Sequence, residues 1–314
     1  MDRRSFFKSA STFLVSVWIP KSVFAFNSKN FGWLPNSQNL YKSLYDSGNL
    51  ENFGQNKVAC LWKAYEEVRK QVWNPRDQVW GDCVAQASGA GLDISTCCRI
   101  AIEHKREKYV NDSSTDMIYA GGRNLVGKRS TGQGMQGIWA MTYLNKWGNL
   151  LKQVYGEYDL RPYNIETVRY WDKHGVPEEL LQLAKKNPLL KYVQVKSWEE
   201  VRDAVAGGKP VVLCTDTFGA NNDLRDEDGF IRPSGSWAHA WLVGGVQDGV
   251  RPGACLLNSH GSSFGRGPKT YGQPDGSVWI DAKYIDRAVS KYKDSYAISD
   301  YKGFDAPEER YIIW

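Results

Sequence analysis

The sequence lacks long hydrophobic runs and a strong excess of charge of either sign. Its N-terminal apolar run, residues 13–19, is far shorter than the roughly 18 to 20 residues that a membrane-spanning helix needs. The 40 basic and 35 acidic residues give a net charge of only +5, spread along the chain without basic arms or clusters. We therefore expect neither stable membrane insertion nor a nucleic-acid partner.

The sequence also lacks the spacing of a metal site. Its six cysteines include no CxxC pair and have no histidine partner at zinc-finger spacing. We expect no structural metal and no organic cofactor. The adjacent Cys97 and Cys98 lie in an apolar stretch, which indicates buried thiols, although an even number of cysteines leaves disulfides open.

Apolar and aromatic residues are plentiful. The 314 residues are 42% apolar, which is enough for one large domain or two ordinary ones. Thirteen Trp and 17 Tyr suit an aromatic-lined cleft, but a large core accounts for them more simply.

The N-terminus has the pattern of a targeting signal. Arg3 and Arg4 precede two phenylalanines, the apolar run ends at Pro20, and residues 23–25 (VFA) offer small side chains for a signal peptidase. This arrangement resembles a twin-arginine export signal, so we expect residues 1–25 to be removed and the protein to be periplasmic or extracellular. The alternative is a basic amphipathic turn that stays on the protein.

The remaining chain divides into helices followed by strands. Residues 26–57 are rich in Asn, Ser and Gly and indicate an extended lead-in. Periodicity, capping residues and apolar runs then predict helices over 58–72, 83–104, 138–147 and 198–206, and strands over 211–215, 240–243, 254–257 and 277–280. This order favours an α+β fold with two subdomains over alternating βαβ units.

Three residues have the chemistry of nucleophilic acyl transfer, which needs a nucleophile, a base and a group that orients the base. Cys83 follows a competent N-cap, Asp82, and the helix N-terminus favours a thiolate there, although the charge of Asp82 opposes it. His239 precedes an apolar strand, and Asn258 ends another. A neutral Asn can accept the imidazole N–H and hold the ring toward the sulfur.

At these residues the chain resembles the papain-like cysteine peptidases. Residues 78–84 (QVWGDCV) are similar to that family's oxyanion glutamine followed by Gly-x-Cys, and residues 134–148 to its Gly-rich stretch and helix. Residues 258–265 (NSHGSSFG) keep the Asn-Ser-x-Gly-x-x-aromatic-Gly frame. The resemblance covers roughly residues 60–290.

The resemblance implies a two-subdomain fold with a cleft between its halves. Residues 58–314 would form the catalytic domain, with a helical half over about 58–160, an antiparallel, barrel-like β half over about 161–290 and a C-terminal tail, 291–314. It also implies one role for each site residue: Cys83 as nucleophile, His239 as general base and acid, Asn258 as its orienting partner, and Gln78 with the Cys83 N–H as oxyanion donors. Main-chain groups of Gly134, Met135, Gln136 and Gly137 would bind an extended substrate.

The sequence departs from the family at several points. Gln78 precedes Cys83 by five residues, one fewer than in the family, and Trp80 stands where the family has a disulfide cysteine. His260 takes the position of a tryptophan that shields the His–Asn hydrogen bond, which indicates a wetter or differently packed site. The family's long helical inhibitory propeptide is not evident.

These patterns leave three functions open. The first is an exported cysteine peptidase that acts on a protein or peptide and has a protein inhibitor as a possible partner. The second keeps the same three residues in a cell-wall amidase or an acyl transferase. The third is an inactive binding protein on the same fold.

Overall fold

The computed structural model describes residues 28–35, 44–45, 50–103, 111–128 and 132–301. The expected signal segment, residues 1–25, lies outside the described residues. In the described part, no helix is both long and apolar enough to cross a bilayer.

One half of the molecule is built on an open, mostly antiparallel sheet. Its order is β5-β10-β6-β7-β8-β9, and the long β7 also pairs in parallel with β1 and antiparallel with β2. The sheet does not close into the barrel-like form that we expected. The strands are β1 Ser28–Asn30, β2 Val58–Cys60, β5 Leu189–Gln194, β6 Val211–Thr215, β7 Ser236–Gln247, β8 Gly253–Leu257, β9 Ser277–Asp281 and β10 Tyr296–Tyr301.

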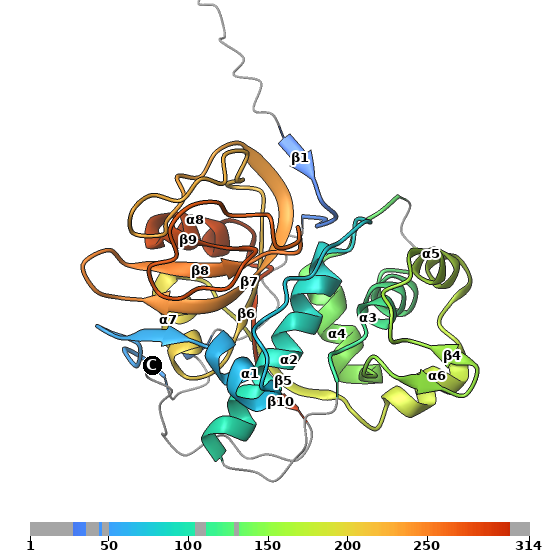
Figure 1. Ribbon diagram of the computed structural model, residues 1–314. Coiled ribbons are helices and arrows are strands. Elements are labelled where there is room, and N and C mark those ends of the chain that lie inside the picture. The colour runs from blue at the N-terminus through green and yellow to red at the C-terminus, as the bar shows by residue number, and fades with distance from the viewer. Residues whose placement is uncertain (1–27, 36–43, 46–49, 104–110, 129–131, 302–314) are drawn as a thin grey trace, which may run out of the picture.

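Helices form the other half and flank the sheet (Figure 1). They are α1 Trp62–Arg69, α2 Cys83–Glu103, α3 Thr115–Gly121, a π-helical turn Gly122–Val126, α4 Gly137–Trp147, α5 Ile165–His174, α6 Glu178–Ala184, α7 Trp198–Ala206 and α8 Ala282–Tyr292. A short hairpin, β3 Val154–Tyr155 and β4 Tyr158–Asp159, lies beside α6. The fold is therefore α+β, as the order of elements predicted.

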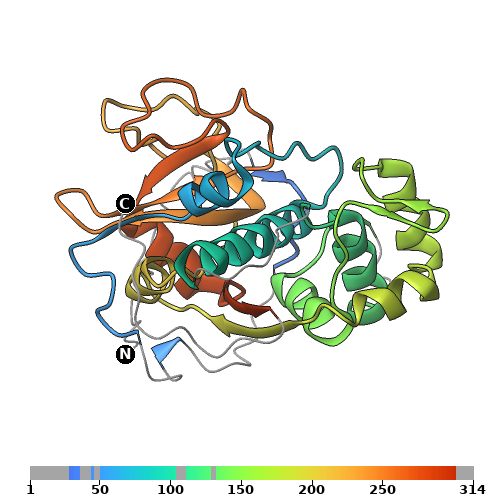
Figure 2. The ribbon, with the colours of Figure 1, turned by 60° about the horizontal axis from the view of Figure 1, so that its bottom comes forward.

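The long helix α2 lies between the two halves and contacts β7 on one side and α3 and α4 on the other (Figure 2). Small residues allow this close packing. A Cβ added at Gly91 would lie 2.8 Å from the side chain of Ile298 in β10, and one added at Gly89 would lie 2.8 Å from Thr115 in α3. Because α2 is wedged between the halves, its first residue is held at their junction.

Three expected boundaries differ from the structure. Residues 58–60, which helical periodicity assigned to a helix, form β2 because they pair with the end of β7. The helices α5 and α6 follow residue 160, yet they lie with the helical half, where α5 packs on α3. Residues 296–301 of the expected tail form β10, which lies between β5 and β6 in the sheet. In each case a partner distant in sequence decides the structure.

The buried carboxylate of Asp203 in α7 ties the lead-in to the sheet half. It accepts hydrogen bonds from Tyr45 Oη (2.7 Å), Asn52 N (2.9 Å), Gly54 N (2.8 Å) and the adjacent Arg202 Nε (2.8 Å). Removing one acceptor leaves several buried donors unsatisfied, and each costs on the order of 1–3 kcal/mol. Asp203 therefore holds Tyr45, Asn52 and Gly54 in place.

We expect Asp203→Ala to lower the free energy of unfolding by about 3 kcal/mol or more, measured by urea denaturation. Asp228→Ala is the matched control, because its carboxylate is 66% exposed and makes only a surface ion pair with Arg251. The control should change stability by less than about 0.5 kcal/mol. Equal effects of the two substitutions would contradict this role of Asp203.

Candidate active site

Cys83 is the first residue of α2 and is completely buried. Burial raises the pKa of its thiol, and the charge of Asp82 acts in the same direction. The backbone N–H groups of Ala240, Val84 and Cys83 itself oppose this shift. Burial prevails in this structure, so the thiol is protonated. The sequence alone left the direction of this pKa shift open, because the helix start and the Asp82 charge act in opposite directions.

The pairing of β7 with β8 brings His239 and Asn258 together. His239 lies in β7, and Asn258 follows directly after β8. The ring Nε2 and Asn258 Oδ1 are 2.8 Å apart, and the same oxygen accepts the N–H of Ser259 at 2.8 Å. Because an amide oxygen only accepts, Nε2 carries the proton and Nδ1 keeps a lone pair.

The free nitrogen of His239 is suited to accept a proton. Nδ1 is buried and has no hydrogen-bond partner among the described residues. The Cys83 thiol lies at the N–H of Ala240, the residue after His239. Burial and the nearby His260 lower the pKa of His239 to about 3, against the effect of the hydrogen bond that Nε2 donates to Asn258. The imidazole is therefore neutral here.

Gln78 lies in the loop between α1 and α2 and is held at both ends. Its Nε2 donates to the carbonyl oxygens of Phe31 (2.9 Å) and Trp80 (2.8 Å). Its Oε1 accepts the hydroxyl of Ser259 at 2.6 Å, and its backbone N–H donates to Ser259 O at 2.9 Å. The side-chain amide is thus aimed at a peptide carbonyl although the spacing to Cys83 is one residue short.

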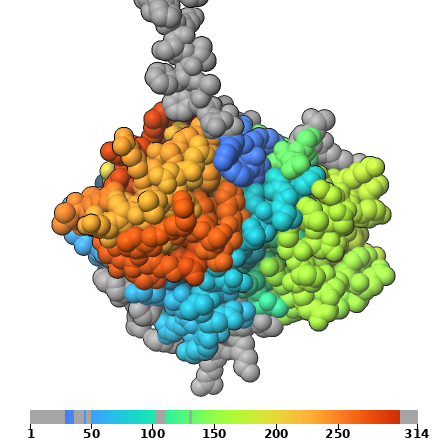
Figure 3. Space-filling model, turned by 45° about the horizontal axis from the view of Figure 1, so that its top comes forward, coloured from blue at the N-terminus to red at the C-terminus, as the bar shows by residue number. Residues whose placement is uncertain are grey.

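An extended segment that precedes the catalytic region lies across these residues. We call residues 28–34 the strap; Figure 3 shows this blue segment between the sheet half and the helical half. On one side β1 pairs with β7, and Phe31 N donates to Ala238 O at 3.0 Å. On the other side Met135 N donates to Gly32 O at 2.8 Å, and Leu34 N donates to Met135 O at 3.0 Å. The strap is bound through its backbone as a peptide is.

The strap also closes the site to water. The ring of Phe31 lies 5.2 Å from the ring of His239 and 4.5 Å from that of His260. The two histidine rings are 4.9 Å apart, and His239 is completely buried. With the strap in place, the space beside both histidines is filled by Phe31, so the site is packed differently there.

Four residues were expected to offer main-chain groups to a substrate, and Met135 is the one that bonds to the strap. Gly134 N donates to the hydroxyl oxygen of Tyr119 at 3.1 Å, and Gly137 N donates to Asp294 at 2.8 Å. Gln136 is the N-cap of α4. The groups of Gly134 and Gly137 are therefore already used within the protein.

Sequence reasoning missed Trp33 and Asp294. The indole N–H of Trp33 donates to Asp294 Oδ2 at 2.9 Å, and both side chains are completely buried. Trp33 lies in a stretch without periodicity, and Asp294 lies between α8 and β10, which were not expected. No local signal in the sequence marks either residue.

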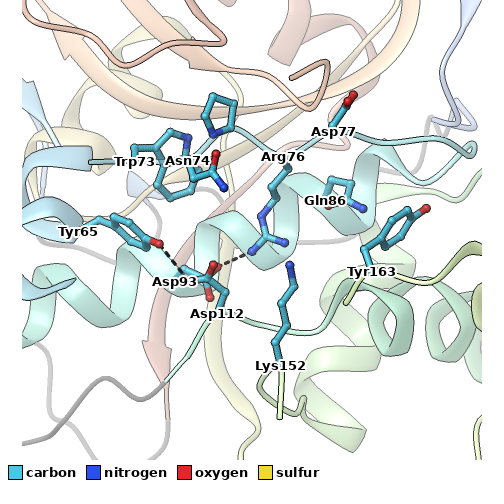
Figure 4. Close-up of a pocket in the computed structure, with 11 residues that line it drawn as sticks. Tyr65, Trp73, Asn74, Arg76, Asp77, Gln86, Asp93, Asp112, Lys152 and Tyr163 are labelled. Carbon is cyan, nitrogen blue, oxygen red and sulfur yellow. Dashed lines mark hydrogen bonds and ion pairs between the residues drawn. The ribbon is translucent and has the colours of Figure 1, made fainter. Parts of the chain in front are cut away.

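A separate polar cavity of about 180 Å³ lies along the flank of α2 (Figure 4). Arg76 and Asp93 form an ion pair in it, and Tyr65 donates to Asp112 at 3.1 Å. Burial, with Arg76 nearby, lowers the pKa of Lys152 at its edge. The cavity lining contains neither a thiol nor a histidine, so it does not include the expected site residues Cys83 and His239.

All six cysteines are buried and unpaired. In the described part of the chain, no group of three or more His, Cys, Asp or Glu side chains is arranged to hold a metal ion.

Comparisons with known proteins give the fold. No family model matches the sequence, and no curated protein matches it. Among solved structures, xylellain, a cysteine protease from Xylella fastidiosa, is 19% identical over 85% of this chain and 95% of its own, with a TM-score of 0.60. Procathepsin L 3 from the larval midgut of Tenebrio molitor is 15% identical over 86% and 76%, with a TM-score of 0.49. Bromelain from Ananas comosus with the E64 inhibitor is 14% identical over 78% and 99%, with a TM-score of 0.47. The chain thus has a papain-like fold.

Proposed function

We propose that this protein is a cysteine peptidase that hydrolyses peptide bonds through Cys83, His239 and Asn258. One observation carries the proposal: an extended peptide, the strap, lies in the groove beside these residues with its Phe31 carbonyl on Gln78 Nε2. The groove therefore already binds a peptide backbone and polarises one of its carbonyls. That xylellain, a protein of the same fold, is described as a cysteine protease supports the proposal.

The reaction follows from the atoms available. The Cys83 thiol passes its proton to His239 Nδ1 as the sulfur attacks the substrate carbonyl, and Asn258 holds the ring through Nε2. Gln78 Nε2 and the Cys83 N–H stabilise the oxyanion. The oxyanion collapses, the C–N bond breaks, and the imidazolium returns the proton to the leaving amine. Water, deprotonated by Nδ1, then attacks the thioester carbonyl. The C–S bond breaks, the acyl group leaves as a carboxylic acid, and the Cys83 thiolate takes the proton back from the imidazolium.

The strap makes the described state latent. Phe31 of the strap covers His239, and both Cys83 and His239 are completely buried. Burial raises the pKa of Cys83 and lowers the pKa of His239 to about 3, so both groups are neutral. Removing the strap hydrates both groups, which lowers the thiol pKa and raises the imidazole pKa toward their ordinary values. A segment of seven residues thereby supplies the inhibition for which no long helical propeptide is evident.

Hydrolysis of a peptide mixture by the full chain carrying Trp33→Ala tests this function. We expect cleavage products by mass spectrometry, and none from the same chain with Cys83→Ala added. Products confined to cell-wall peptides, or acyl transfer to an added amine without hydrolysis, would favour the amidase or transferase. If the groove opens but no substrate is turned over, the inactive binding protein is the function that remains.

Export by the twin-arginine route belongs to the same proposal. Arg3, Arg4 and residues 23–25 support it. N-terminal sequencing of the protein recovered from a bacterial periplasm should begin at Phe26, and a retained Met1 in the cytoplasm would contradict it.

The proposed role of Gln78 gives a further prediction. We expect Gln78→Ala, placed in the Trp33→Ala chain, to lower kcat by about 10²- to 10³-fold with little change in KM, because the lost donor serves the transition state. Ser259→Ala is the matched control, since it removes only the hydroxyl that orients Gln78 Oε1. Ser259→Ala should lower kcat only by about a few-fold. Steady-state kinetics on one fluorogenic peptide measure both, and an unchanged kcat in Gln78→Ala would remove the residue from the oxyanion site.

A further inference from the structure

The strap pairs on one side with a loop that belongs to no helix or strand. We call residues 132–136 the binding loop. Met135 N donates to Gly32 O at 2.8 Å, and Leu34 N donates to Met135 O at 3.0 Å. Gly134 has a φ of +102°, and a Cβ added there would lie 2.5 Å from Gly32 O. The backbone of the binding loop therefore lies directly against the bound peptide, so the position of the loop decides how well a peptide fits.

The buried guanidinium of Arg123 holds the binding loop. Arg123 lies in the π-helical turn that follows α3, and its side chain is only 2% exposed. Its Nη2 donates to Gly132 O at 2.5 Å, and its Nη1 donates to Gly134 O. A planar guanidinium presents two N–H donors in a fixed fork, which the more flexible ammonium of a lysine does not. The fork of Arg123 thus fixes two carbonyls of the binding loop at once.

Two further side chains fix the guanidinium and the loop. Asp172 in α5 accepts Arg123 Nε at 2.6 Å, which gives the buried cation its counter-ion. The guanidinium carbon lies 5.4 Å from the ring centroid of Tyr119 in α3, and the hydroxyl of Tyr119 accepts the N–H of Gly134 at 3.1 Å. Both α3 and α5 belong to the helical half (Figure 1). The binding loop is therefore tied to the helical half through Arg123 and Tyr119.

The contacts of the binding loop differ from those at the reacting carbonyl. Gln78 Nε2 donates to the carbonyl of Phe31, whereas the binding loop bonds to Gly32 and Leu34. Bonds to the neighbouring residues of a peptide are made in the ground state as well as in the transition state. A loss of such bonds raises KM and changes kcat little.

We propose that Arg123 is a positioning residue for peptide binding, because its guanidinium holds the binding loop where Met135 pairs with a peptide backbone. The inference rests on the proposed peptidase function, since it names the side chain that sets the backbone affinity of the same groove. It applies equally to the strap, which occupies these backbone groups in the described state.

Hydrogen exchange of the full chain tests the inference without any need for catalysis. Arg123→Lys keeps a cation beside Asp172 but loses the planar pair of donors to the binding loop. The amides of Leu34 and Met135 are bonded across the contact between strap and loop, so their exchange measures how firmly the two are held together. Both amides should exchange about tenfold faster in Arg123→Lys than in the native chain, measured by mass spectrometry with fragmentation.

Arg202→Lys is the matched control. Arg202 is another buried arginine that is paired with a carboxylate, Asp203, but it lies in α7, outside the binding loop and the helices that hold it. This control should leave the exchange of Leu34 and Met135 within about twofold of the native value. Equal acceleration by Arg202→Lys and Arg123→Lys would overturn the proposal.

Asp172→Asn keeps the inference testable if thermal melting shows that Arg123→Lys does not fold. The carboxylate of Asp172 is 20% exposed, and an asparagine keeps an acceptor oxygen but removes the charge that fixes Arg123 Nε. We expect the Met135 amide to exchange about threefold faster in this variant. Unchanged exchange of Met135 in every folded variant of the pair would overturn the role of Arg123.

Kinetics separate this inference from the proposed function. In the Trp33→Ala chain, Arg123→Lys should raise KM for one fluorogenic peptide about tenfold and leave kcat within about threefold. A fall in kcat with an unchanged KM would overturn the positioning role and leave the peptidase standing. Faster exchange in Arg123→Lys, together with no cleavage by the Trp33→Ala chain, would keep the role of Arg123 and overturn the peptidase.

Discussion

Trp33→Ala in the full chain should increase the rate at which an epoxide-type thiol inhibitor labels the protein by about a hundredfold or more. The reason is the loss of the strap's anchor. Trp33 is completely buried and hydrogen-bonded to Asp294, and a Trp-to-Ala change at such a site costs about 3–5 kcal/mol. Since 1.4 kcal/mol is a factor of ten, the opening equilibrium should shift by about 10²- to 4 × 10³-fold. Intact-mass spectrometry at timed intervals measures the rate.

The matched control is another buried tryptophan that does not contact the strap. Trp198, at the start of α7, is 7% exposed. Trp198→Ala should lower the melting temperature but leave the labelling rate of the folded protein within a few-fold of the native value. An unchanged labelling rate in Trp33→Ala would mean that the strap does not limit access to the thiol. A rate raised equally by both substitutions would point to general loosening of the fold.

His239→Ala, placed in the Trp33→Ala chain, should lower kcat/KM for a peptide substrate by about 10³-fold or more. In the proposed mechanism the imidazole is the base, and its Nδ1 has no partner among the described residues. General acid–base catalysis contributes typically about 10²- to 10⁴-fold to the rate. Loss of the imidazolium that follows proton transfer from the thiol adds to the effect. Initial rates at several substrate concentrations give the ratio.

His174 offers the control for this substitution. It is exposed at the end of α5, and its ring contacts that of Tyr170. His174→Ala should leave kcat/KM within about twofold. If His239→Ala retained more than a tenth of the activity, another group would have to serve as the base.

Local patterns were sufficient for the elements that carry the proposed chemistry. The capping residue before Cys83 predicted where α2 begins, and the structure has this boundary. The apolar run after His239 predicted part of β7, and the run before Asn258 predicted β8. These features depend on neighbours in sequence, so the sequence reveals them. Their hydrogen bond follows once the two strands pair.

The strap and the hydrogen bond of its Trp33 to Asp294 depend on contacts that no local pattern encodes. Trp33 and Asp294 are 261 positions apart in sequence, and neither lies in a periodic segment. Similarly, residues 58–60 have apolar spacing compatible with a helix, and only the edge of β7 makes them a strand. Tertiary contacts override weak local preference in such segments.

Mapping the epoxide adduct on the full-length Trp33→Ala protein tests the central claim most directly, because the chain holds six unpaired thiols and Cys83 lies at the N–H of Ala240, the residue after His239. Peptide mapping should find a single adduct, on Cys83, and the adduct should disappear when His239→Ala is added. Adducts spread over Cys60, Cys97, Cys98, Cys214 and Cys255, or labelling of Cys83 that is indifferent to His239, would contradict the account and leave a papain-like fold without a working nucleophile.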